Sequence, residues 1–124
     1  MPLVEYSKSK GLVQKAGSGF SIADVPVAEH IQTLSTGADA TISAHGTHLL
    51  TSTGACTVTL SAGSYAGQKK LIVLVTDGGD ITLVGETDGA DADNNEALGT
   101  MDAAGEHILL LWIGDRWVTL STAL

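Results

Sequence analysis

The sequence predicts an all-β fold, in the form of a single compact antiparallel β-sandwich or jelly-roll-like domain. Fifteen glycines and only two Trp, two Tyr and one Phe in 124 residues are typical of turns and short strands rather than of a helical bundle. Apolar and polar residues alternate with a period of two over residues 40–44 and 56–60. Residues 71–75 are all apolar, which in so short a run predicts a strand covered on both faces.

Residues 1–27 are expected to form an extended N-terminal arm, followed by a β-domain over residues 28–124. Apolar residues in the arm occur as separated pairs and singles among Gly and Pro, without a helical or strand period. Residues 1–20 carry three lysines against Glu5, a net of +2, whereas the other 104 residues carry three positive and thirteen negative charges, a net of −10. An arm of this kind is expected to bind a groove on a partner, through Leu3, Val4, Lys8, Lys10, Leu12, Val13, Lys15 and Phe20.

The composition also excludes several classes of protein. A net charge of −8 argues against nucleic acid as a partner, since phosphate contacts need a positive surface. The longest apolar runs, residues 71–75 and 108–113, are far shorter than the ~20 residues that span a bilayer. Charges near the N-terminus stand where a signal peptide would be apolar, which predicts synthesis in a cytoplasm. The lone cysteine, Cys56, is expected to be a small buried apolar side chain.

Three further segments carry local predictions. Residues 27–34 have the only helical character, enough for one or two turns. The Asp-Gly-Gly-Asp sequence at residues 77–80 predicts a tight turn that joins residues 71–75 to a partner strand at 81–84. Residues 85–104 form a twenty-residue acidic stretch, which we expect to be an exposed loop.

The last hairpin can be registered residue by residue. A two-residue loop at Gly114 and Asp115 pairs Trp112 with Trp117. One face of the hairpin is then predicted to be the protomer's core, and it consists of Leu109, Leu111, Ile113, Val118 and Leu120. The opposite face is also apolar, so we expect either a second sheet or another subunit to cover it. The predicted interface residues are Ile108, Leu110, Trp112 and Trp117.

Four segments in a fixed order carry a resemblance to a known group of proteins. They are Thr-Val-Thr-Leu-Ser-Ala-Gly at 57–63, Gly-Gln-Lys-Lys-Leu-Ile-Val at 67–73, Gly-Asp-Ile-Thr-Leu at 79–83 and Gly-Asp-Arg-Trp-Val at 114–118. Over residues 53–120 the chain resembles small β-rich bacteriophage virion proteins, namely head-fibre, decoration and tail-fibre-type domains. The resemblance implies an obligate homotrimer. The chain lacks a heptad stalk or collagen-like repeat, which favours a compact capsid-attached protein over a long fibre.

The resemblance leads to an expected function and one alternative. The chain is expected to be a phage virion structural protein, a capsid decoration or head-fibre-like homotrimer made in the host cytoplasm. Its arm would bind the phage major capsid protein. The alternative is a receptor-binding tail-fibre tip or carbohydrate-binding module, in which Trp112 and Trp117 stack on a host surface glycan. The interface interpretation is preferred because Ile108 and Leu110 continue an apolar stripe where a sugar site needs polar groups.

No enzyme activity, cofactor or metal is expected. The sequence has no G-x-S-x-G, G-x-x-x-x-G-K, G-x-G-x-x-G or H-E-x-x-H motif. His45 and His48 lie three residues apart, so a strand would point them to opposite faces, and no further ligands complete a zinc site. The acidic stretch matches a calcium loop in part, through Asp91, Asp93, Asn95 and Asp102. Because Glu96 stands where that loop needs Gly, a solvated acidic loop is the preferred interpretation.

Overall fold

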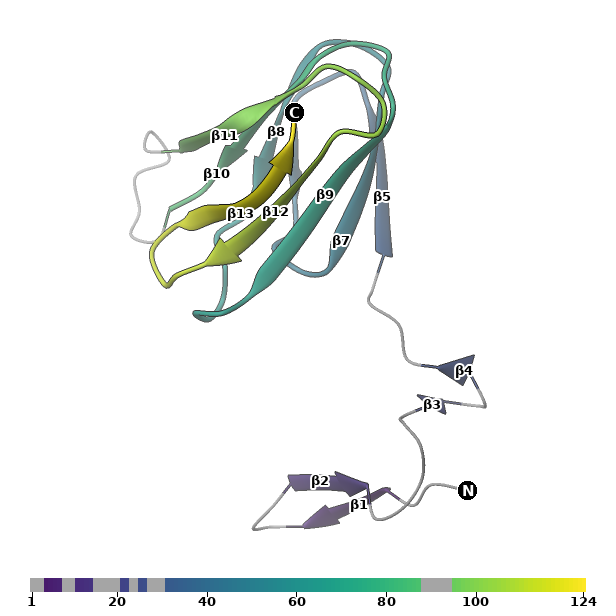
Figure 1. Ribbon diagram of the computed structural model, residues 1–124, viewed down its shortest axis with the longest axis vertical. Coiled ribbons are helices and arrows are strands. Elements are labelled where there is room, and N and C mark those ends of the chain that lie inside the picture. Colours follow the sequence, from purple (N-terminus) through teal and green to yellow (C-terminus); the bar gives the residue numbers. More distant parts are fainter. Residues whose placement is uncertain (1–3, 8–10, 15–20, 23–24, 27–30, 88–94) are drawn as a thin grey trace.

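A computed structural model describes residues 4–7, 11–14, 21–22, 25–26, 31–87 and 95–124 of the chain (Figure 1). Every helix or strand within these residues is a β-strand, so the all-β prediction is confirmed. Four short strands come first: β1 (Val4–Ser7), β2 (Gly11–Gln14), β3 (Ser21–Ile22) and β4 (Val25–Pro26). They form two separate pairs, β1 with β2 and β3 with β4.

Residues 31–124, called the body below, contain two larger sheets. The strands are β5 (Ile31–Thr36), β6 (Ala40–Ile42), β7 (Thr47–Ser52), β8 (Cys56–Leu60), β9 (Lys69–Thr76), β10 (Ile81–Gly85), β11 (Glu96–Met101), β12 (His107–Trp112) and β13 (Trp117–Ala123). One sheet has four strands in the order β11-β10-β8-β6. The other has five strands in the order β13-β12-β9-β7-β5.

The sheets are mixed, which corrects the prediction of an antiparallel fold. Strands β5, β7 and β9 are parallel, and so are β6, β8 and β10. From β5 to β10 each turn carries the chain to the opposite sheet, so the next strand in the same sheet starts again from the same end. The chain thus makes three stacked rungs, each rung being one strand in each sheet (Figure 1). Antiparallel pairing occurs only in the last part of the body, where β11 pairs with β10, and β12 pairs with β9 and β13.

Three local predictions are wrong for related reasons. The turn at residues 77–80 does not close a hairpin, because it joins β9 in one sheet to β10 in the other. The predicted helix at 27–34 is wrong in its described part, where residues 31–34 belong to β5. Alternating exposure along this strand and parallel pairing with β7 favour the extended form. The expected loop at 85–104 contains β11, which pairs with β10.

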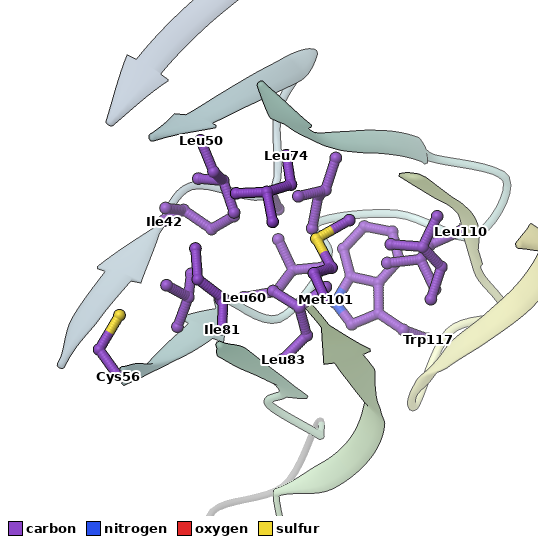
Figure 2. Packing of buried hydrophobic residues seen from close by; sticks show 14 of the residues in the cluster. Ile42, Leu50, Cys56, Leu60, Leu74, Ile81, Leu83, Met101, Leu110 and Trp117 are labelled. Atoms are coloured by element: carbon purple, nitrogen blue, oxygen red, sulfur yellow. The ribbon is translucent and has the colours of Figure 1, made fainter. Parts of the chain in front are cut away.

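The hydrophobic core lies between the two sheets and is built from both of them. Figure 2 shows Leu60, Leu83 and Met101 of the four-stranded sheet in one cluster with Leu110 and Trp117 of the five-stranded sheet. Because successive rungs pair in parallel, the same residue type can lie in line along the sheet. Leu34 pairs with Leu50, and Leu50 pairs with Leu74. Cys56 is buried at the margin of this core, as predicted for a small apolar side chain.

Acidic residues occupy the turns at one end of the body. The strands β5, β7, β9 and β11 all finish at one end, and the turns that follow them hold Asp39, Asp77, Asp80, Asp102 and Glu106. No Lys or Arg occurs in these four turns. We call this the acidic end. Mutual repulsion there raises the pKa of Asp102, with Glu106 as the largest cause.

Candidate functional site

The four residues predicted to contact another subunit are buried inside the single chain. Trp112 and Trp117 are each 2% exposed, and Ile108 and Leu110 are fully buried. The two indoles are register partners with ring centroids 5.3 Å apart in an edge-on arrangement. Trp117 Nε1 donates a hydrogen bond to the Ser61 carbonyl oxygen at 3.0 Å. The interface prediction for these four residues is therefore wrong, and the indoles offer no platform for a sugar.

The strand pairing of the last hairpin was predicted correctly. However, the face predicted to form the core points outward, and the face that bears the two tryptophans points inward. Trp112 pairs with Trp117, and the Ile113 N–H donates to the Arg116 carbonyl oxygen across the turn. Both faces of this hairpin are apolar, so the pattern does not say which one faces inward. Two glycines decide the outcome. A Cβ on Gly63 would lie 2.2 Å from Trp112, and a Cβ on Gly85 would lie 3.1 Å from Trp117, so each indole packs where a side chain is missing.

The face predicted to be the core lies instead on the outer side of the five-stranded sheet. Three cross-strand pairs of apolar side chains follow one another there: Leu49 with Val73, Leu71 with Leu109, and Leu111 with Val118. All six are half-buried in the single chain. We call these six residues the outer apolar face.

More strongly exposed apolar side chains extend this surface. Ile31 is 58% exposed and Val75 50%, and both share the side of the sheet that bears the outer apolar face, while Ile113, 44% exposed, follows the end of β12. An exposed apolar surface of this extent on a folded chain is typical of a contact site for another molecule. The outer apolar face is therefore the candidate functional site.

The outer side of the four-stranded sheet provides a comparison within the same chain. Threonines occupy it in register, since Thr41 pairs with Thr59 and Thr82 pairs with both Thr57 and Thr100. Thr41, Thr82 and Thr100 are exposed. Threonine favours the extended backbone and its hydroxyl binds water, so this side is suited to solvent. The two outer sides thus differ in the chemistry that they present.

The chain matches no protein-family model and no curated protein. The outer apolar face is therefore interpreted from its own residues. Within the described residues, there is no helix long and apolar enough to cross a membrane. The same residues contain no group of three or more His, Cys, Asp or Glu side chains placed to hold a metal ion.

The sequence suggested two pairs of possible metal ligands, His45 with His48 and Asn95 with Asp102, and the structure separates the members of each pair. His45 is exposed, whereas His48 is buried with Nδ1 2.6 Å from the Lys70 ammonium nitrogen. Asn95 and Asp102 lie at opposite ends of the body, because the whole of β11 separates them. Six residues of strand span about 20 Å, so these two side chains cannot share one calcium ion. Asp91 and Asp93 lie outside the described residues.

Sequence reasoning missed a buried polar cluster, which we define as His48, Gln68 and Lys70. The Lys70 ammonium group is fully buried and donates to the His45 carbonyl oxygen at 2.6 Å. Gln68 donates from Nε2 to the Ala44 carbonyl oxygen at 3.0 Å, and its Oε1 accepts from a backbone N–H at 2.8 Å. The signal was present in the sequence, because Lys70 occupies an inward position together with Ile72 and Leu74.

The residues predicted to make the arm's contacts are described only in part. Val4 begins β1, while Leu12 and Val13 lie in β2. Leu3, Lys8, Lys10, Lys15 and Phe20 lie outside the described residues. The described strands of the arm pair only with each other and join neither sheet of the body. The division at residue 27 remains a prediction.

Proposed function

We propose that this chain is a structural protein of a bacteriophage virion, a capsid decoration or head-fibre-like protein with a β-sandwich body. In this proposal three copies form a homotrimer, and residues 1–27 bind the major capsid protein. The observation that carries the proposal is the separation of arm and body. The described arm strands β1 to β4 complete no sheet of the body, and every residue of the core cluster lies between Ile42 and Trp117.

Charge supports the same division of roles. The net +2 of residues 1–20 is opposite in sign to the net −10 of the remaining chain. A positively charged arm would therefore be attracted to an acidic capsid surface, whereas the acidic body would be repelled by it. Extended segments with spaced apolar residues bind by adding main-chain hydrogen bonds and burying side chains.

The segments behind the sequence resemblance also fit a structural role. Residues 57–60 lie in β8, residues 69–73 in β9 and residues 81–83 in β10, and Trp117 begins β13. These strands supply most of the core, so the shared pattern encodes the body rather than an exposed reactive site. The glycan-binding alternative is not carried forward, because it depended on the two indoles that are buried.

Binding to phage particles that lack the protein tests the proposal. A variant without residues 2–22 is expected to keep its β-rich circular dichroism spectrum and its oligomeric state, and to lose particle binding. In the full chain, Lys8→Gln with Lys10→Gln is expected to weaken binding at low salt. A control with Arg116→Gln removes a positive charge from the last turn of the body and is expected to bind normally. Full binding by the deletion variant would overturn the arm's role.

A further inference from the structure

We infer that the outer apolar face is the surface through which copies of this chain associate. The inference deepens the proposed function and rests on it, because it places the subunit contact of the proposed homotrimer on named residues. The face that bears Trp112 and Trp117 cannot provide this contact, because it is buried in the core of the single chain.

The first step of the argument is the size and continuity of the surface. Five strands at a spacing of about 4.8 Å, each with about six residues rising about 3.3 Å, give a sheet about 24 Å by 20 Å. That outline is ~480 Å², a little over half of the roughly 800 Å² that one partner buries in a standard interface. The Leu49–Val73, Leu71–Leu109 and Leu111–Val118 pairs lie within this area on adjacent strands.

The second step is the contrast with the other sheet. Both sheets bury their inner sides in one core, and no described strand of the body covers the outer side of either sheet. The four-stranded sheet presents mainly threonines there, with Val84 among them, whereas the five-stranded sheet presents leucines and valines on β9 and β12, flanked by Ser and Thr on β5 and β7. Leu71 and Leu111 are only half-buried in the single chain, so covering this side would remove further apolar surface from water. The five-stranded sheet is therefore built to be covered.

The third step identifies the occupant as a second copy of the chain. The five described strands of this sheet contain no Asp or Glu, although the chain has fourteen such residues. Lys69 and His107 are the ionisable residues on its outer side. A charged partner would find few groups to pair with on this face, whereas three copies around a three-fold axis can each turn this apolar face toward the axis. The acidic end keeps its carboxylates in turns, away from the centre of the contact.

The mass of the full-length chain and of matched variants in sedimentation velocity tests this inference. We expect a trimer for the unmodified chain. Leu71→Lys with Leu111→Lys is expected to give monomers with an unchanged emission spectrum from the buried indoles. The control, Thr59→Lys with Thr82→Lys, adds the same two charges to the opposite sheet and is expected to remain trimeric. Because lysine lowers the net negative charge, loss of association cannot result from general repulsion between acidic chains.

A second double substitution, which disturbs the strands less, distinguishes loss of association from loss of folding. Leu71→Thr with Leu111→Thr copies the chemistry of the four-stranded sheet and keeps the preference for strand. We expect the concentration at half-dissociation to rise by at least about tenfold, because two leucine contacts leave the interface.

The outcomes separate this inference from the proposed function. If the unmodified chain is trimeric and both outer-face variants stay trimeric, the interface lies elsewhere and the homotrimer stands. If the unmodified chain is monomeric at every concentration yet binds particles through its arm, the interface is overturned and the attachment role survives. Dissociation of the threonine-side control would also overturn the assignment.

Discussion

The ammonium nitrogen of Lys70 lies 2.6 Å from Nδ1 of His48, and both side chains are buried. The two nitrogens are within hydrogen-bond distance of each other. The same ammonium group donates to the His45 carbonyl oxygen, so β9 is tied to the turn that precedes β7. The contact joins the second rung to the third at the end opposite to the acidic end.

Replacement of Lys70 by alanine is expected to destabilise the body by about 2–4 kcal/mol. The change leaves the buried Nδ1 of His48 without this partner and opens a cavity where the lysine stem packs. Urea unfolding measures the effect. The neighbouring Lys69 is exposed, so Lys69→Ala is expected to stay within about 0.5 kcal/mol of the unmodified chain. Equal effects of the two substitutions would contradict a structural role for the polar cluster.

Repulsion at the acidic end predicts a pH-dependent gain from neutralising Asp102. Its pKa is raised mainly by Glu106, with smaller contributions from burial, a side-chain hydrogen bond to Glu106, Asp80 and Asp77. A raised pKa means that the folded chain binds this proton more readily than the unfolded chain, so the ionised carboxylate costs stability above its pKa. Asp102→Asn is expected to raise the melting temperature at pH 7. The gain should vanish as the pH falls below the pKa of Asp102.

Asp115→Asn serves as the control for this charge effect, because Asp115 lies in the turn at the other end of the body. Added salt is expected to reduce the gain from Asp102→Asn, since the group is exposed and screening weakens the repulsion. An equal gain from both substitutions would show that total charge, rather than the acidic end, sets the effect.

Much of the local structure was predictable from the sequence, but the order of the strands was not. Alternation at residues 56–60 and the Gly114–Asp115 turn identify strands and one register, because both depend on neighbours in sequence. The Asp-Gly-Gly-Asp turn at 77–80 suits a hairpin and a crossing between sheets equally well. The choice between them depends on the preceding strands, because β9 pairs in parallel with β7 in one sheet and β10 pairs in parallel with β8 in the other. The inward face of β12 depends likewise on distant glycines at 63 and 85.

Burial of Cys56 predicts a thiol that reacts slowly in the folded chain. Desolvation is the larger cause that raises the pKa of this thiol, and the charge of Asp39 is the smaller one. A raised pKa leaves less thiolate, the reactive form, at neutral pH. Alkylation by iodoacetamide at pH 7.5, followed by intact mass, is expected to be slow in buffer and fast in urea. A native rate equal to that of glutathione would contradict the buried placement of Cys56.

The contact between Gly63 and Trp112 predicts a large effect from one added methyl group. A Cβ at this position would lie 2.2 Å from the indole, and the ring is confined by the core between the two sheets. Gly63→Ala is therefore expected to destabilise the body by at least about 2 kcal/mol and to shift the tryptophan emission to longer wavelength. Gly54→Ala provides the control, because its nearest contact would be 3.7 Å away. If Gly63→Ala unfolds at the same urea concentration as Gly54→Ala, then Trp112 does not pack against Gly63.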